Sequence, residues 1–467
     1  MDYMIYLLLG LLIIYIELTR KKFFVIDHIM IFHFFYFLVY VLTPIALKYY
    51  GTDILHVDLQ LGKFYFDKNP FTAVIVFLAY LFFLLGFNMY HIGTKVSDFT
   101  IQLQISDKKW LYMIFFAYFV LFTALFIYVQ GEGGLITAIQ NAELYRSGII
   151  FAKYGFLKRF FPLNTILLLY TWYKVFLQKN SEHLQVYKLF FLMSTVLFIL
   201  FVALNNSRGF ILAHILGLYI ITAIYHRRFF AKYILLLGLL GIFIIKYGDP
   251  LFYAIPAWVN HDFDLFIKTF NERITYHNMV DHNIFANFAH PIISLETSLA
   301  LTGNQINFRY FIDFWHALVA LLPNKIFGIE DPQFVMVLNT EMTYGEKISI
   351  VLPGILALFA YSLHAVGVFL GMFFYGIVGR ILLEIFKTLY RQYPSSIVYI
   401  YLISFTYGYF VFRGSPRNAL FDSFIMIITI IILLVLSNIQ FRKNKEKKIT
   451  VDFPRNVKTT NYRDSSI

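Results

Sequence analysis

The chain has 467 residues, of which 59% are hydrophobic and only 14% charged, and its mean hydropathy is +0.67. Because a soluble domain carries about a quarter charged residues, the composition excludes an ordinary soluble protein and predicts an integral membrane protein. Cysteine is absent, which excludes disulfides, thiolate metal sites and a cysteine nucleophile. The net charge of +12 does not require nucleic acid as a partner, because lysine and arginine concentrate in the cytoplasmic loops of membrane proteins.

Apolar runs of about 17 to 25 residues predict an all-α polytopic membrane protein with about eleven transmembrane helices. Eight fall within residues 1–247 and three within residues 363–441. In chain order the expected helices are 3–19, 28–47, 70–92, 110–129, 161–178, 188–205, 209–226, 229–247, 363–387, 396–412 and 418–440. Charged residues rather than a small-residue cleavage site follow the first run, so we expect it to be a spanning helix and not a signal peptide.

Clusters of lysine and arginine predict the orientation of these helices. Basic residues occur at 20–22, 108–109 and 227–228 and again in the tail from Arg442, which is every second predicted boundary. The positive-inside rule then places the N-terminus outside and the C-terminus in the cytoplasm. Residues 442–467 are polar and without periodicity, so we expect a disordered basic cytoplasmic tail.

Residues 248–362 form a long loop that this orientation places on the external, periplasmic side. Within it, Phe314, Trp315 and Leu318 share one helical face, and the nearby Asp313 argues against a membrane crossing, so we expect an interfacial helix. The apolar stretch 350–386 is too long for one span, and Pro353-Gly354 interrupts its start, so we expect residues 350–361 to be a re-entrant or interfacial piece. A loop of this size suits a protein that acts on a molecule held at the membrane surface.

Arginines at external helix starts are the first candidate site residues. Arg208 follows Ser207, and Arg417 follows the cap-like pair Ser415-Pro416, so both are expected in the first turn of a spanning helix. Cations are disfavoured there unless an anion binds. A phosphate or diphosphate would satisfy these arginines, together with Arg413 and Arg146; the alternative is that they reach lipid headgroups. Lys153, Lys158 and Arg159 extend this basic external patch.

Two residues are candidate proton acceptors. His364 lies near the outer end of a predicted helix in which Gly367 and Gly371 permit close packing. Glu341 precedes the re-entrant piece. The loop histidines show no metal-binding spacing, and we expect ordinary hydrogen-bonded or exposed side chains for most of them: His261, His277, His282, His290 and His316.

At these positions the chain resembles a bacterial oligosaccharide repeat-unit polymerase of the Wzy type, which builds O-antigen, capsule or enterobacterial common antigen and is similar to GT-C glycosyltransferases. The resemblance rests on the helix count, the long late external loop and three short motifs. The motifs are NNSRG at 205–209, the segment from LLPNKIFG to EKISIVLPG at 321–354, and FRG at 412–414.

The resemblance implies a glycosyltransferase of the bacterial inner membrane with its active site at the periplasmic face. The donor is a glycan chain on undecaprenyl diphosphate, and the acceptor is one repeat unit on the same lipid. Arginines neutralise the diphosphate leaving group, a base takes the acceptor proton, and no metal or other cofactor is required. Membrane lipid, a chain-length regulator and a flippase are the partner classes implied, and nucleic acid is not among them.

Three other functions compete with this interpretation. An O-antigen ligase would use the same donor but deliver the chain to lipid A core, and a histidine late in the loop, such as His364, is typical of it. A membrane O-acyltransferase would need an intramembrane histidine paired with a cytosolic Asn or Asp, which we do not find. A lipid-linked oligosaccharide flippase or transporter favours internal repeats and needs no long external loop.

Overall fold

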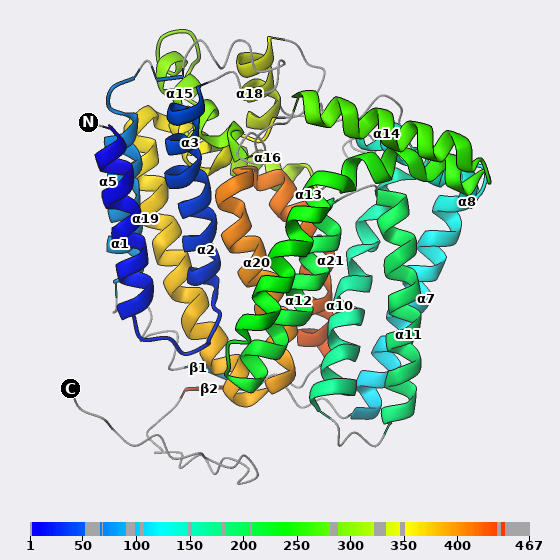
Figure 1. Ribbon diagram of the computed structural model, residues 1–467. Coiled ribbons are helices and arrows are strands. Elements are labelled where there is room, and N and C mark those ends of the chain that lie inside the picture. Colours follow the sequence, from blue (N-terminus) through cyan, green and yellow to red (C-terminus); the bar gives the residue numbers. More distant parts are fainter. Residues whose placement is uncertain are drawn as a thin grey trace.

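The computed structural model describes residues 2–51, 66–67, 69–89, 99–102, 107–147, 152–178, 183–205, 208–280, 288–321, 333–345, 351–436 and 440–443. Apart from two short strands, the described elements are all helices (Figure 1). Up to residue 205 the helices are α1 (Asp2–Thr19), α2 (His28–Phe37), the π-helix η1 (Leu38–Leu42), α3 (Thr43–Tyr50), α5 (Thr72–Phe87), α7 (Asp107–Gly131), α8 (Leu135–Gln140), α9 (Ala142–Ser147), η4 (Gly155–Phe160), α10 (Pro162–Trp172), η5 (Tyr173–Leu177) and α11 (Leu184–Asn205).

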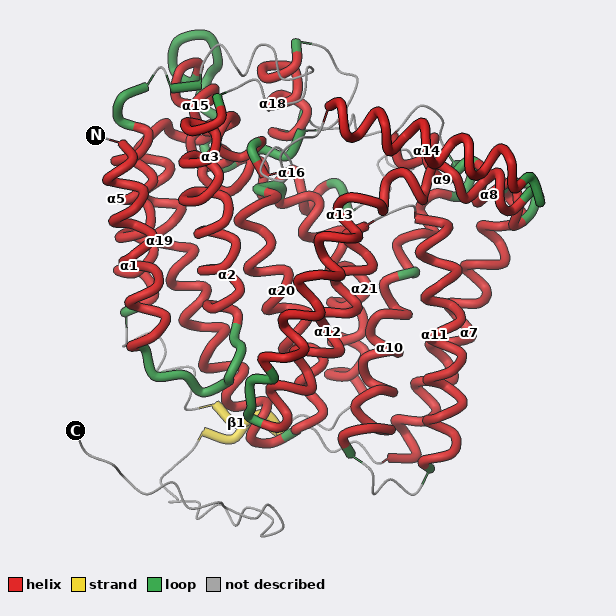
Figure 2. The backbone as a smooth tube through the Cα atoms, in the orientation of Figure 1, coloured by secondary structure: helices red, strands yellow, loops and turns green. Residues whose placement is uncertain are grey.

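The second half of the chain continues in the same way. Its helices are α12 (Arg208–His226), α13 (Ala231–Val259), α14 (Phe263–Val280), α15 (His290–Leu301), α16 (Ile312–Val319), α18 (Val335–Tyr344), α19 (Gly354–Gln392), η7 (Pro394–Ser396), α20 (Ile397–Arg413) and α21 (Pro416–Leu436). Two short antiparallel strands, β1 (Phe99–Gln102) and β2 (Gln440–Lys443), pair at the lower end of the molecule (Figure 2). The predicted disordered tail is therefore wrong for Arg442 and Lys443, whose backbone pairs with β1, and the rest of it lies outside the described residues.

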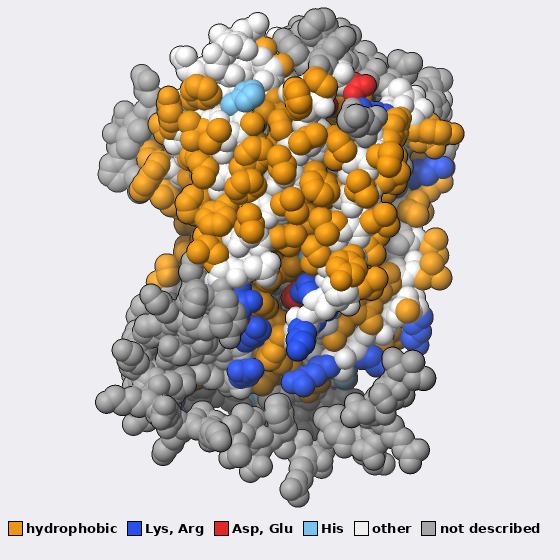
Figure 3. Space-filling view, turned by 90° about the vertical axis from the view of Figure 1, so that its left-hand side faces the viewer, with side chains coloured by type: hydrophobic (Ala, Val, Ile, Leu, Met, Phe, Trp, Pro, Cys, Tyr) orange, Lys and Arg blue, Asp and Glu red, His pale blue; other side chains and the backbone are white. Residues whose placement is uncertain are grey.

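The helices have the length and composition of a multi-pass membrane protein. In the part of the chain that the structure describes, eight helices are long and apolar enough to cross a bilayer. They coincide with eight of the predicted spans, and the other three predicted spans coincide with α1, α5 and α21. Figure 3 shows a band of hydrophobic side chains around the middle of one face, with lysine and arginine side chains gathered below it.

Two clusters of buried side chains form the core. One lies among α1, α2, α5, α15 and α19, and the other lies among α7, α10, α11, α12 and α20. Helices α2 and α20 pack along each other and join the two halves. We call the end of the bundle that carries α14, α15 and α18, drawn at the top of Figure 1, the upper end.

Charged side chains fix the lower ends of α1 and α2. Arg20 donates to both carboxylate oxygens of Glu17 and to both of Asp27, at 2.6 to 2.9 Å. Asp27 also caps α2 by accepting from the amide of Met30 at 2.8 Å. Because nearly every polar atom of these buried groups has a partner, the cluster satisfies the conditions under which a buried ion pair is tolerated.

One spanning helix continues beyond its membrane-spanning part. The candidate span, Ala231–Gly248, agrees with the predicted span 229–247, but the helix itself does not end there: α13 continues to Val259 with Pro250 and Pro256 inside it. Proline removes a backbone hydrogen bond and bends a helix, and the spanning part, Ala231–Gly248, is followed by a separate apolar stretch, Pro250–Val259. Figures 1 and 2 show this second stretch turned aside to run next to α14 across the upper end.

Helix α16 has the expected surface-lying character, but the role of Asp313 differs. Phe314, Trp315 and Leu318 are exposed on one face, as the pattern predicted. Asp313 is 1% exposed, forms an ion pair with Arg309 at 2.7 Å and accepts from the amide of Val335 at 2.7 Å. The Asp313 side chain therefore faces inward and holds α16 against the start of α18. Its role is in the packing of these two helices.

Candidate functional site

The junction between α20 and α21 follows the expected local chemistry. Gly414 ends α20 with a left-handed backbone, φ 56°, and Pro416 is the first residue of α21. The Ser415 hydroxyl accepts from the amide of Asn418 at 3.3 Å, which confirms the predicted N-cap. The turn places Arg413 at the last position of one helix and Arg417 in the first turn of the next.

Two arginines from distant parts of the chain contact one aromatic ring. The guanidinium of Arg159 in η4 lies 4.2 Å from the centroid of Phe421, and that of Arg417 lies 5.2 Å from the same centroid. Arg417 also lies 4.6 Å from the ring of Phe334, which precedes α18. Two guanidinium groups of the same charge therefore lie near one ring, and an anion bound beside them would reduce their mutual repulsion.

Arg413 is partly neutralised within the protein. Its guanidinium forms an ion pair with Asp422 of α21 and lies 4.7 Å from the ring of Tyr409. Its Nε is buried and has no hydrogen-bond partner among the described residues. Arg413 therefore belongs to the junction, but it carries less uncompensated charge than its position in the sequence suggested.

Lys158 continues the cationic surface toward α11. Its Nζ donates to the Leu204 carbonyl at 3.0 Å and lies 5.2 and 5.5 Å from the rings of Tyr128 and Tyr145. We name Lys158, Arg159, Arg413 and Arg417 the upper basic cluster. Glu132 is the carboxylate on the Lys158 side, where it accepts hydrogen bonds from Tyr145 and from the Lys153 amide.

The sequence analysis placed Arg159 in the basic external patch but not among the candidate diphosphate ligands, although a further signal was present. Pro162 is the first residue of α10, as Pro416 is of α21, so Arg159 also precedes a helix start marked by proline. Its contact with Phe421 depends on the packing of segments far apart in the chain and has no sequence signature. Arg208 is the first residue of α12 and Arg146 lies in α9, as expected, while the side chains of both lie outside the described residues.

Glu341 lies on the helix that approaches the basic cluster. Helix α18 begins beside Phe334, which contacts Arg417, and its Met336 Sδ lies 3.7 Å from the Ser415 hydroxyl. Glu341 is half-buried and five positions further along, about 7.5 Å at 1.5 Å per residue. Glu341 thus shares a helix with the residue that contacts Ser415, and it is the candidate base on that helix.

His364 lies at a break within α19. Leu363 and His364 have non-helical backbone angles, with φ 55° at His364. The short helix before the break, 354–362, is buried and folds back on the long one, since a Cβ on Gly367 would overlap the Phe359 carbonyl and one on Gly371 the Phe359 ring. This doubling back explains why the two facing positions, Gly367 and Gly371, carry small residues.

The imidazole of His364 makes a hydrogen bond within the fold. Its Nε2 lies 2.8 Å from the Leu299 carbonyl of α15. A carbonyl only accepts, so Nε2 carries a proton and Nδ1 is the nitrogen that can take another. His364 therefore ties the break to α15 rather than to the basic cluster, and its structural role is evident.

The described residues contain no group of three or more His, Asp or Glu side chains placed to hold a metal ion. His282 lies outside the described residues, and the other loop histidines are dispersed over α14, α15 and α16 and the turn before α14. The upper end instead carries arginine, lysine and aromatic side chains, which are suited to binding an anion.

The fold and the site together define an all-helical protein with eight candidate membrane-spanning helices and a cationic cluster at one end of them. Comparison with protein-family models found no match, and comparisons with curated proteins and with solved structures also found none.

Proposed function

We propose that the chain is an oligosaccharide repeat-unit polymerase of the bacterial inner membrane. It transfers a growing glycan chain from undecaprenyl diphosphate to a lipid-linked repeat unit, in the synthesis of a surface polysaccharide. The observation that carries the proposal is the contact of Arg159 and Arg417 with the single ring of Phe421, at the end of an apolar helical bundle. The resemblance of the short motifs adds the substrate class.

The proposed orientation places the upper end outside. The lower end carries the basic boundaries of α1–α2, α7 and α12, which the positive-inside rule assigns to the cytoplasm. The upper basic cluster is then an exception to that rule, and an anionic substrate would account for it. Eleven spans, with α1, α5 and α21 crossing besides the eight long helices, complete this topology.

The transfer is a single displacement in this proposal. The acceptor hydroxyl attacks the anomeric carbon, the bond from that carbon to the diphosphate oxygen breaks, and a base takes the hydroxyl proton. Arg159 and Arg417 stabilise the charge that grows on the diphosphate, with Arg208, Arg146 and Arg413 as further ligands. Glu341 is the base favoured by its place on α18, and His364 is the second candidate.

The glycan profile of a strain lacking the gene tests the proposal. Surface glycans reduced to single repeat units indicate that polymerisation is lost and support it. Long chains stranded on the carrier lipid would show a ligase instead, and repeat units accumulating on the cytoplasmic side would show a flippase. Purified protein in liposomes should elongate a synthetic lipid-linked repeat unit, and its failure under conditions where a known polymerase works would contradict the proposal.

A further inference from the structure

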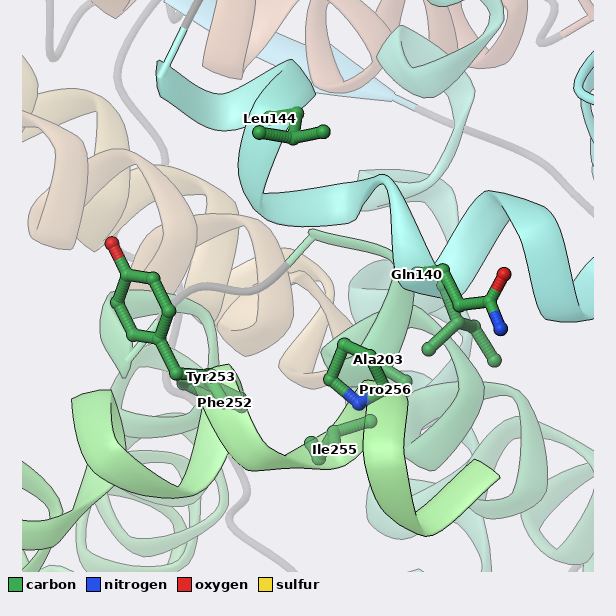
Figure 4. A pocket seen from close by; sticks show the side chains of 8 residues that line it. Gln140, Leu144, Ala203, Phe252, Tyr253, Ile255 and Pro256 are labelled. Atoms are coloured by element: carbon green, nitrogen blue, oxygen red, sulfur yellow. The ribbon is translucent and has the colours of Figure 1, made fainter. Parts of the chain in front are cut away.

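A cavity of about 200 Å³ lies at the upper end, between the short helices α8 and α9 on one side and the second stretch of α13 on the other (Figure 4). Six of its eight lining side chains are apolar: Ile139, Leu144, Ala203, Phe252, Ile255 and Pro256. Ala203 comes from α11, close to that helix's upper end. The cavity is therefore an apolar space among helices that run across the end of the bundle.

The two polar side chains of the lining are engaged by the protein. Gln140 donates from its Nε2 to the Oδ1 of Asn260 at 2.6 Å, which fastens α8 to the end of α13. The ring of Tyr253 is covered by the guanidinium of Arg273 in α14, at 3.7 Å from the centroid. The Gln140 amide is thus engaged by Asn260 and the Tyr253 ring is covered by Arg273, and the six apolar side chains make up the rest of the lining.

The wall of the cavity continues directly into the upper basic cluster. Leu144 and Ala203 line the cavity, and their chain neighbours Tyr145 and Leu204 both contact Lys158. The next residue, Arg159, contacts Phe421 and so leads to Arg417. An apolar space beside a row of cations matches an amphiphile with one apolar chain and a phosphate-bearing end.

The size of the cavity limits which part of such a molecule it can hold. Sites for drug-sized ligands measure about 300 to 1,000 Å³, so this space is too small for an oligosaccharide. It admits a segment of one unbranched or methyl-branched chain. A single-chain isoprenoid fits this better than a phospholipid, which carries two acyl chains.

We propose that this cavity binds the phosphate-proximal part of the isoprenoid chain of a polyprenyl diphosphate substrate, with Lys158 at the phosphate end. The inference rests on the function proposed above and adds to it a site for the lipid tail. It predicts that the carrier lipid enters beneath α8 and α9 and directs its diphosphate toward Arg159 and Arg417.

The test is photolabelling of the full-length protein in liposomes with a polyprenyl diphosphate that carries a diazirine on its first isoprene units. Labelled peptides are located by mass spectrometry. We expect labelling in 139–144 and 252–256, and we expect unlabelled undecaprenyl phosphate to compete for it. A diazirine-bearing phosphatidylglycerol serves as the comparison probe.

Two variants reduce the volume of the cavity by substitutions on different helices. If one of them misfolds, the other still tests the inference. Ala203→Phe fills it from α11, and Leu144→Trp narrows it from the surface helix α9. Ile199→Phe is the matched control, because Ile199 is on α11 and 65% exposed on its outward face. Labelling at limiting probe should fall about tenfold in the two cavity variants, the affinity that a few buried methylene groups contribute, and stay unchanged in the control.

Three outcomes would overturn the inference: labelling spread evenly over the outward helix faces, equal labelling of the two segments by phosphatidylglycerol, or labelling that survives in both cavity variants. Labelling requires binding but no sugar transfer. A glycan profile that contradicts the polymerase would therefore overturn the proposed function without changing the labelling pattern, and the two failures are distinguishable.

Discussion

At the scale of single residues, the upper end is organised by aromatic rings that hold cations. Arg159 and Arg417 make cation–π contacts with Phe421, Arg413 makes one with Tyr409, and Lys158 makes one with Tyr145. A ring restrains a guanidinium without neutralising it, whereas a carboxylate neutralises it. Arg413 lies against Tyr409 and also pairs with Asp422, which neutralises part of its charge.

Arg417→Ala should lower the rate of polymerisation by about 100-fold or more, the effect of removing one group that stabilises charge in a transition state. Arg417→Lys should recover little, because an ammonium lacks the two-pronged geometry of guanidinium. Arg391→Ala is the matched control, since Arg391 lies 5.2 Å from the ring of Phe23 at the lower end. The measurement is chain elongation on a synthetic lipid-linked repeat unit.

Arg159→Ala should resemble Arg417→Ala, and Arg413→Ala should lose less because Asp422 already engages its charge. Arg208→Ala is expected to lose activity as well. Protein levels in the membrane must be equal among these variants. Full activity in the Arg159 variant would remove that residue from the site and weaken the assignment of the whole cluster.

The pH dependence of the rate distinguishes the two candidate bases. Histidine side chains ordinarily titrate near about 6.5 and glutamates near about 4.3. A histidine base therefore predicts that activity falls as the pH drops from 7 to 5, whereas a glutamate base predicts a flat rate. We expect the flat profile and a loss of about 100-fold or more in Glu341→Gln, within the range for a missing general base.

For His364 the substitution must respect the backbone. Its left-handed φ of 55° suits asparagine or glycine better than alanine, so His364→Asn separates loss of the imidazole from strain at the break. A rate that falls steeply below pH 7 in the parent protein and becomes flat in His364→Asn would make His364 the base and contradict the assignment to Glu341.

At the scale of elements, the upper end depends on backbones that touch. The left-handed Gly414 that ends α20 contacts Gly354, where the short buried helix 354–362 begins. A Cβ on Gly414 would overlap the carbonyl oxygen of Gly354. The position of the arginine junction is thus set by a contact between two main chains.

Gly414→Ala should destabilise the protein by about 1 to 3 kcal/mol, since it combines a left-handed backbone with a steric overlap. Gly238→Ala is the control, because a Cβ there meets nothing within 4 Å and alanine favours the helix. Thermal unfolding in detergent measures both. Equal melting temperatures for Gly414→Ala and the parent would contradict the described contact.

Local patterns in the sequence predicted the elements well. Each expected span coincides with a helix, and the cap at Ser415 and the break near residue 363 follow from residues adjacent in the chain. Local patterns could not predict the contact of Arg159 with Phe421 or the doubling back of 354–362, because both depend on which helices pack together. The inward orientation of Asp313 was missed for the same reason: its partner amide belongs to Val335.

At the scale of the whole molecule, a buried carboxyl group connects the loop region to the first core. Glu296 of α15 is 3% exposed and accepts from the amide of Asp67, which forms an ion pair with Lys48 at 2.6 Å. Burial raises the pKa of Glu296 to about 8, and the Asp67 amide opposes that increase. The folded protein therefore holds a proton that the unfolded chain releases near its ordinary value.

This difference predicts the pH dependence of stability. The stabilisation is complete below the ordinary pKa of 4.5 and is lost as the pH rises toward about 8, at a rate of at most about 1.4 kcal/mol per pH unit. Glu296→Gln should remove this part of the dependence, and Glu272→Gln, at an exposed position of α14, should not. The measurement is the melting temperature from pH 5 to 8.5, and parallel curves for the parent and Glu296→Gln would contradict the prediction.

The short helix 354–362 connects the arginine junction with the region around His364. Its first residue contacts Gly414, between Arg413 and Arg417, and two residues after its last residue comes His364, bonded to α15. Nine helical residues make a stiff rod about 13 Å long. The same buried helix therefore packs against the arginine junction at one end and leads into the residue that bonds to α15 at the other, so one rigid element fixes the distance between the two.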